Sequence, residues 1–208
     1  MGQAPLLSAA EIFTLFFVTL GPLKVLGPFA QRTRGREDLT ELSFWAFSIA
    51  TISAVAGGFL GTVLLAKWEI SMAALMLAAG IIFFLVALKQ LMAQYERAMP
   101  LSDAPLPEPA LAAAAQLVFP VVLTPYGIAA VIALLARSNG GERTTTIIAI
   151  LIGVLVLDLL AMLFARRILV GIVPLVLQVV GAVLAVLQVA FSIQFILGGL
   201  KALQVIAA

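Results

Sequence analysis

TLFFVTLGPLKVLGPFA, at residues 14–30, is apolar enough to enter a membrane but poorly suited to one continuous helix. Gly-Pro pairs occur at Gly21-Pro22 and Gly27-Pro28, with Lys24 between them. Proline lacks a backbone donor and clashes with the preceding helical turn. The stretch therefore predicts a membrane helix that is broken at both pairs.

A second stretch, FPVVLTPYGIAA at residues 119–130, has a similar pattern. It contains Pro120, Pro125 and Gly127 in an otherwise apolar sequence. Interrupted apolar segments at corresponding positions in the two halves of a membrane protein point to a transport site. We therefore expect the two stretches to act together.

The composition predicts an all-α polytopic membrane protein. Of the 208 residues, 63% are hydrophobic and 11% are charged, against about a quarter charged in soluble domains. The net charge of +2 and the scattered basic residues do not favour nucleic-acid binding. The chain contains neither cysteine nor histidine, so we expect no metal, no cofactor and no enzymatic activity.

Six apolar segments approach the length of about 20 residues that a membrane-spanning helix needs. They lie at residues 6–30, 42–66, 71–91, 111–136, 146–165 and 175–205. The apolar tail is too long for one span and just long enough for two. We favour one long helix with a short lead-in, because Gly171 and Pro174 punctuate its start.

The positive charges of the loops predict the orientation. Seven basic residues fall on one side, expected to be cytoplasmic: Arg32, Arg34, Arg36, Lys89, Arg97, Arg166 and Arg167. Four fall on the other side: Lys67, Arg137, Arg143 and Lys201. Both termini are therefore expected outside the cytoplasm.

Residues 95–109, YERAMPLSDAPLPEP, predict a Pro-rich cytoplasmic linker between two halves, 1–94 and 110–208. Each half has three spans, so the halves enter the membrane in opposite directions. Pro22 and Pro125 are offset by about 103 residues, and Gly80 and Gly181 by about 101. We expect two inverted three-helix repeats, with the first and fourth helices broken.

Four motifs in order make the chain similar to the MarC family of six-span bacterial inner-membrane proteins. They are Gly21-Pro22-Leu23-Lys24, the run from Gly80 to Lys89-Gln90-Leu91, Pro120 with Thr124-Pro125-Tyr126-Gly127, and Gln194-Phe195-Ile196 with Gly199. The resemblance implies a bacterial inner-membrane location and transport of small neutral amino acids. The chain resembles a divergent member, because Gly21 replaces a family Asn, Lys24 a small residue, and Thr124 the first Gly of Gly-Pro-Gly.

The broken helices supply the candidate solute site. Unpaired backbone groups are tolerated in a membrane only against protein or a wet cavity, and helix N-termini favour anions. Two antiparallel breaks would then hold both ends of a zwitterion. The candidate binding residues are Thr19, Gly21, Pro22, Lys24, Thr124, Pro125, Tyr126 and Gly127. The alternative is a pair of proline kinks that only shape helix packing.

Two charged residues lie within apolar helices, and such residues mark functional sites by default. Lys24 either snorkels to the cytoplasmic interface or belongs to the site. Asp158 is expected at a similar depth, so we predict that Lys24 and Asp158 pair or share a wet cavity. If they pair, protonation of Asp158 would release Lys24 and couple transport to protons.

The leading hypothesis is a secondary transporter or exporter of a small polar solute. The alternative is an accessory or structural subunit of a larger membrane complex. An intramembrane enzyme is disfavoured, because one deep Asp without His or Cys makes no catalytic set. Expected partners are the solute, the lipid bilayer, and either a second copy of the chain or other membrane proteins.

The final apolar segment carries three glutamines, Gln178, Gln188 and Gln194. They are expected to form interhelical hydrogen bonds.

Overall fold

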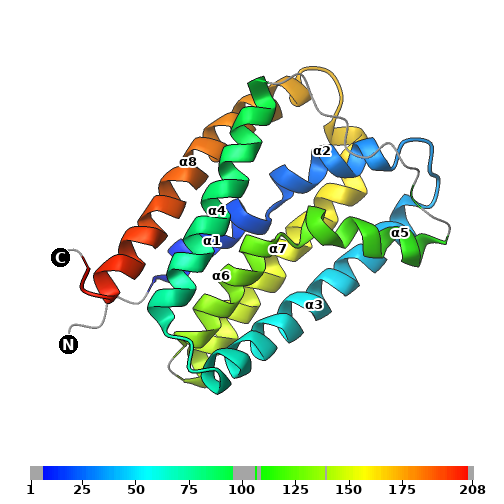
Figure 1. The fold of residues 1–208 in the computed structure, drawn as a ribbon. Helices are drawn as coiled ribbons and strands as arrows, with labels where there is room; N and C mark the ends of the chain where they lie inside the picture. Colours follow the sequence, from blue (N-terminus) through cyan, green and yellow to red (C-terminus); the bar gives the residue numbers. More distant parts are fainter. Residues whose placement is uncertain (1–6, 96–105, 107–108, 139, 206–208) are drawn as a thin grey trace.

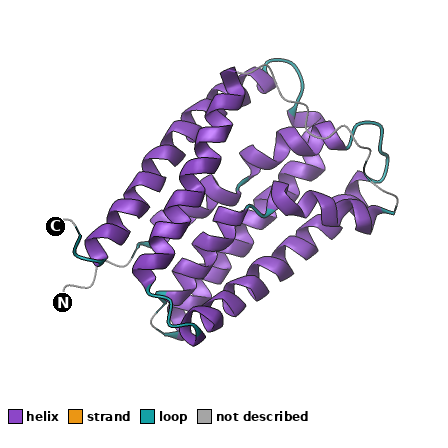
Figure 2. Cartoon of the chain, viewed as in Figure 1, coloured by secondary structure: helices purple, strands orange, loops and turns teal. Residues whose placement is uncertain are grey.

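The chain folds into a bundle of helices in the computed structural model, which describes residues 7–95, 106, 109–138 and 140–205. The first half contains α1 (Ala9–Leu20), α2 (Pro22–Arg32), α3 (Leu39–Lys67) and α4 (Met72–Tyr95). The second half contains α5 (Ala110–Leu117), a π-helical turn η1 (Val118–Val122), α6 (Pro125–Ala136), α7 (Gly141–Ile168) and α8 (Val173–Ala202). No strand occurs among the described residues (Figure 2).

The first predicted break is confirmed at Gly21, where the backbone is extended (φ −70°, ψ 172°) between α1 and α2. Pro22 is the first residue of α2, a position where the missing N–H costs no helical hydrogen bond. The second predicted break, at Gly27-Pro28, is wrong, because α2 continues through Pro28 to Arg32. Burial of Val25, Leu26 and Phe29 holds this half-helix together although Pro28 removes one donor.

The fourth predicted span, 111–136, is also broken. Five residues of π-helix, including Pro120, follow α5, and Leu123 and Thr124 are extended. Pro125 then begins α6, as Pro22 begins α2. Figure 2 shows both breaks as short non-helical segments near the middle of the bundle.

The two broken helices run in opposite directions. Leu106, just before α5, lies against Arg36 in the loop that follows α2, where the Arg36 guanidinium donates to the Leu106 carbonyl over 3.4 Å. Residues of α6 line a small cavity with Leu7 and Leu15 at the beginning of α1. By contrast, α7 runs parallel to α1 and α2, since Arg143 donates to the Leu7 carbonyl and Arg166 to the Arg36 carbonyl.

Long helices surround the breaks. Helix α7 packs against α1, α2 and α3, and α3 packs against α5 and α6. The most extensive contact joins α4 to α8, which lie side by side at one edge of the bundle (Figure 1). The sequence prediction of one long final helix after a short lead-in is confirmed, since α8 is continuous and Gly171 has a positive φ of 65°.

The structure supports a polytopic membrane protein. Among the described residues, five helical segments are long and apolar enough to span a membrane: Ala9–Arg32, Leu39–Lys67, Met72–Lys89, Gly141–Ile168 and Val179–Ala202. A shorter apolar helix covers Pro125–Ala136. Most of the predicted linker at 95–109 lies outside the described residues.

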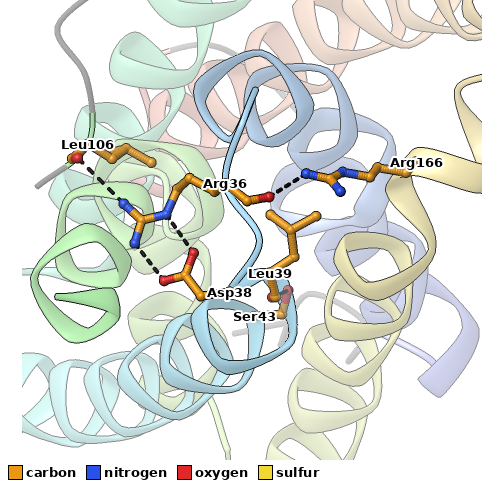
Figure 3. A network of polar contacts seen from close by, with 6 residues as sticks. All are labelled: Arg36, Asp38, Leu39, Ser43, Leu106 and Arg166. Atoms are coloured by element: carbon orange, nitrogen blue, oxygen red, sulfur yellow. Dashed lines mark hydrogen bonds and ion pairs between the residues drawn. The ribbon is translucent and has the colours of Figure 1, made fainter. Parts of the chain in front are cut away.

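A polar cluster ties the α2–α3 loop to the second half of the chain (Figure 3). Arg36 donates two hydrogen bonds to the Asp38 carboxylate, over 2.9 and 2.6 Å. Its guanidinium also reaches the Leu106 carbonyl, and its own carbonyl accepts from Arg166. One arginine therefore connects the loop before α3 with residues before α5 and at the end of α7.

We predict that Asp38→Asn makes the protein less sensitive to acid. The hydrogen bonds from Arg36 hold the pKa of Asp38 below its usual value. A lowered pKa stabilises the fold above the unfolded-state pKa of about 4, and this stabilisation is lost as the pH falls through the lower, folded-state value. The Asp38 side chain is 31% exposed, so we expect the variant to lose less than about 1 kcal/mol at pH 7.

The measurement is the melting temperature of the detergent-solubilised protein between pH 7 and pH 3. The control is Glu37→Gln, an exposed carboxylate of the same loop. An Asp38→Asn protein that loses stability on acidification as steeply as the wild type would contradict the assignment.

Candidate functional site

Thr124 links the two breaks to each other. As the residue that caps α6, it accepts a hydrogen bond on Oγ1 from the Gly127 N–H over 3.1 Å. The same hydroxyl donates to the Thr19 carbonyl at the end of α1, also over 3.1 Å. One buried side chain thus satisfies a free donor of one half-helix and a carbonyl of the other. The sequence predicted that Thr19, Thr124 and Gly127 belong to one site, and in the structure they are in direct contact.

The breaks approach each other too closely for larger residues. A Cβ atom added to Gly127 would lie 2.2 Å from Cδ2 of Leu20, the last residue of α1. A Cβ atom added to Gly21 would lie 2.1 Å from the Phe17 carbonyl oxygen. At Gly127 an added side chain is therefore opposed by Leu20 where the two breaks meet, a point that we call the crossing, whereas at Gly21 it is opposed by the last turn of its own helix, α1. Neither glycine has a positive φ.

Lys24 extends from α2 to α6. Its ammonium group donates to the Tyr126 hydroxyl and lies 4.5 Å from the centre of the Tyr126 ring. Tyr126 is 3% exposed and stacks on Phe83 of α4, with ring centroids 5.0 Å apart. Of the two alternatives for Lys24, this geometry matches a place in the site, because the ammonium faces another helix rather than the membrane interface.

Gln188 of α8 contacts the end of α1 close to the first break. Its Nε2 donates to the Val18 carbonyl in the last turn of α1, over 2.9 Å. The interhelical hydrogen bond predicted for this residue is confirmed. Its Oε1 is fully buried and has no hydrogen-bond partner among the described residues. An unpaired buried acceptor is costly, so this oxygen marks a place suited to a further donor.

Thr19 contributes its carbonyl rather than its hydroxyl, which donates back to the Leu15 carbonyl over 2.7 Å. Phe83 was not predicted, because one Phe in an apolar helix gives no signal. Gln188 was predicted to form an interhelical hydrogen bond but was not assigned to the site, because an amide in an apolar helix signals a helix contact rather than a binding role.

The predicted ion pair between Lys24 and Asp158 is wrong for this structure. Lys24 contacts Tyr126, and both carboxylate oxygens of Asp158 lack a partner among the described residues. Asp158 is 1% exposed on the face of α7 that packs against α1, α2 and α3. Helix length and rise predict the depth of the two charges but not the directions of their side chains. Tyr126 offers Lys24 a closer partner.

A cavity of about 560 Å³ lies at the arginine-rich end of the bundle, and we call it the vestibule. It lies between α2, the end of α7 and α8. Its walls are Leu23, Gly27, Ala30, Gln31, Arg34, Ala165, Arg166, Leu169 and Leu177. At the opposite end, the cavity between α1 and α6 holds only about 40 Å³. Of these two cavities, the wider one faces the side that loop charge predicts to be cytoplasmic.

The model of the MarC family, described as integral membrane proteins, matches residues 8–204. The chain belongs to the MarC family. No curated protein and no solved structure matches it. The match covers both broken helices and all the long helices around them, so the resemblance seen in the sequence is confirmed.

The three positions at which the sequence is expected to depart from the family pattern lie at the breaks of this MarC family protein. Gly21 and Thr124 are the extended residues that precede the two half-helices, and Lys24 lies in the first turn of α2.

We predict that Gly127→Ala destabilises the protein by about 1–3 kcal/mol, the usual cost of overpacking a close contact. The added methyl group must push Leu20 away and disturb the Thr124 cap. The matched control is Gly181→Ala on α8, where an added Cβ meets no atom within 4 Å. That change should be neutral or stabilising, by up to about 1 kcal/mol.

The two variants are compared by thermal unfolding in the same detergent. Equal melting temperatures for Gly127→Ala and Gly181→Ala would show that the two breaks do not approach as closely as the structure indicates.

Proposed function

We propose that this MarC family protein is a secondary transporter or exporter of a small polar solute, with a neutral amino acid as the favoured class. The observation that carries the proposal is the contact between two antiparallel broken helices, joined by the Thr124–Thr19 hydrogen bond deep in the bundle. In many transporters the solute site is formed by the ends of half-helices that meet near the middle of the membrane.

Helix packing favours the inverted repeat on which this proposal depends. The broken helix of the first half, α1 and α2, packs against α7 of the second half. The broken helix of the second half packs against α3 of the first half, and α4 packs against α8. This reciprocal pattern is what a pseudo-twofold axis in the membrane plane generates. Pro22 and Pro125 each begin a half-helix, and Gly80 and Gly181 each follow the first residue of α4 or α8 by eight positions, although only Gly80 lies close to a neighbouring helix.

The buried charges favour a functional site over proline kinks that only shape packing. A charged group within a membrane is expensive and is retained where it binds or moves something. Lys24 meets a neutral phenol, and Asp158 meets no hydrogen-bonding group among the described residues. We assign Asp158 to coupling or gating, because an unpaired buried carboxylate must be accompanied by a proton or a cation.

In this proposal the protein lies in the bacterial inner membrane with the vestibule toward the cytoplasm and both termini in the periplasm. The balance of loop charges supports this orientation. The wider cavity on the arginine-rich side then corresponds to a state open to the cytoplasm.

The test is uptake of radiolabelled alanine by liposomes that contain the purified protein, with and without a pH gradient. We expect uptake above that of empty liposomes, increased by the gradient. Asp158→Asn should remove the effect of the gradient while the protein still folds. Glu142→Gln, an exposed carboxylate in the first turn of the same helix, should behave as the wild type.

The alternative is an accessory subunit of a larger membrane complex. Absence of uptake of any small solute, together with copurification of partner proteins at fixed stoichiometry, would contradict transport and support this alternative.

A further inference from the structure

We propose that Lys24 is the specificity-determining residue of the site and that it binds the carboxylate group of the solute. This inference rests on the proposed transport function and adds to it the chemical class of the solute. In the state described here Tyr126 occupies the place that the carboxylate would take.

The first argument is the missing counter-charge. Lys24 is half-buried in an apolar helix, and its partners are the hydroxyl and ring of Tyr126, which carry no full charge. Within the described residues the recorded ion pair is Arg36–Asp38, outside the membrane-spanning segments. A cation removed from water without an anion is destabilised, and a carboxylate offers a much stronger interaction than a phenol.

The second argument is the position of Lys24 within α2. It lies in the first turn, directly after the break at Gly21. Pro22 has no N–H and the Lys24 N–H donates to the Gly21 carbonyl over 3.2 Å, so it is the positive end of the helix dipole that favours a negative group at this point. Proximity of α6, which also begins at the crossing, adds a second helix N-terminus of the same sign.

The third argument is the positive charge of the residues that line the vestibule. Leu23, the neighbour of Lys24, lines the vestibule, and Arg34 and Arg166 are the charged residues of its lining. No acidic residue is among the described residues that line it. A path lined by one sign of charge raises the local concentration of ligands of the opposite sign. The vestibule would therefore concentrate anionic solutes next to the turn of α2 that carries Lys24.

The fourth argument concerns the rest of the solute. The buried Oε1 of Gln188 has no donor, and its side chain is fixed on the Val18 carbonyl at the same crossing. This acceptor suits an N–H group such as the ammonium of an amino acid. The site thus offers a cation for one end of a zwitterion and a neutral acceptor for the other.

The experiment is equilibrium binding of alanine and of alaninamide, which lacks the carboxylate, to the full chain in nanodiscs. The wild type should bind alanine about tenfold more tightly or better, since one charge-assisted contact contributes at least about 1.4 kcal/mol. Lys24→Met should lose this preference by weakening alanine binding and leaving alaninamide unchanged. Lys24→Arg should retain most of it.

Lys67→Met, at the exposed end of α3, is the matched control and should bind as the wild type does. Thermal unfolding of each variant verifies the fold, and the preference between the two ligands is independent of the fraction of folded protein. A Lys24→Met protein that still prefers alanine to the wild-type extent would overturn the inference and leave transport standing. A wild type that binds neither ligand, and moves no small solute in liposomes, would overturn both.

Discussion

A break in a membrane helix exposes backbone groups that hydrocarbon cannot satisfy, and the rest of this structure follows from how they are satisfied. Each unpaired N–H or C=O costs several kcal/mol in lipid, so both breaks must face protein or water. Here they face each other. The Thr124 hydroxyl serves the Gly127 N–H and the Thr19 carbonyl, and Gln188 serves the Val18 carbonyl. These contacts hold the two broken helices together near the centre of the bundle.

The surrounding helices isolate this crossing from lipid. Helix α7 covers one broken helix and α3 covers the other, while α4 and α8 form a separate pair at the edge. The α4–α8 pair also contributes to the crossing, through Phe83 and Gln188. The crossing therefore lies where the α4–α8 pair meets the two broken helices.

Much of the fold could be predicted from the sequence because its signals are local. The lengths of the apolar segments predicted the long helices, and Pro22 and Pro125 marked the first residues of the two half-helices. The break expected at Gly27-Pro28 failed because tertiary burial of Val25, Leu26 and Phe29 outweighs one lost hydrogen bond. A proline therefore predicts a break only where no packing compensates for it.

Less of the site could be predicted, because it depends on side-chain direction. The sequence placed Lys24 and Asp158 at similar depth, but depth does not determine which residue a flexible lysine contacts, and the structure gives it Tyr126. The contribution of Phe83 depends on how α4 meets α6, which no local pattern encodes.

The most direct test of the account asks whether water reaches the crossing through the vestibule. The chain has no cysteine, so a single one can be introduced at Leu23, which lines the vestibule, or at Ile52 on the exposed apolar face of α3. The measurement is labelling by a membrane-impermeant maleimide in oriented vesicles. The account predicts labelling of Leu23→Cys from the arginine-rich side and none of Ile52→Cys. A Leu23→Cys protein that stays unlabelled from both sides would mean that the broken helices are sealed, and would contradict the central claim.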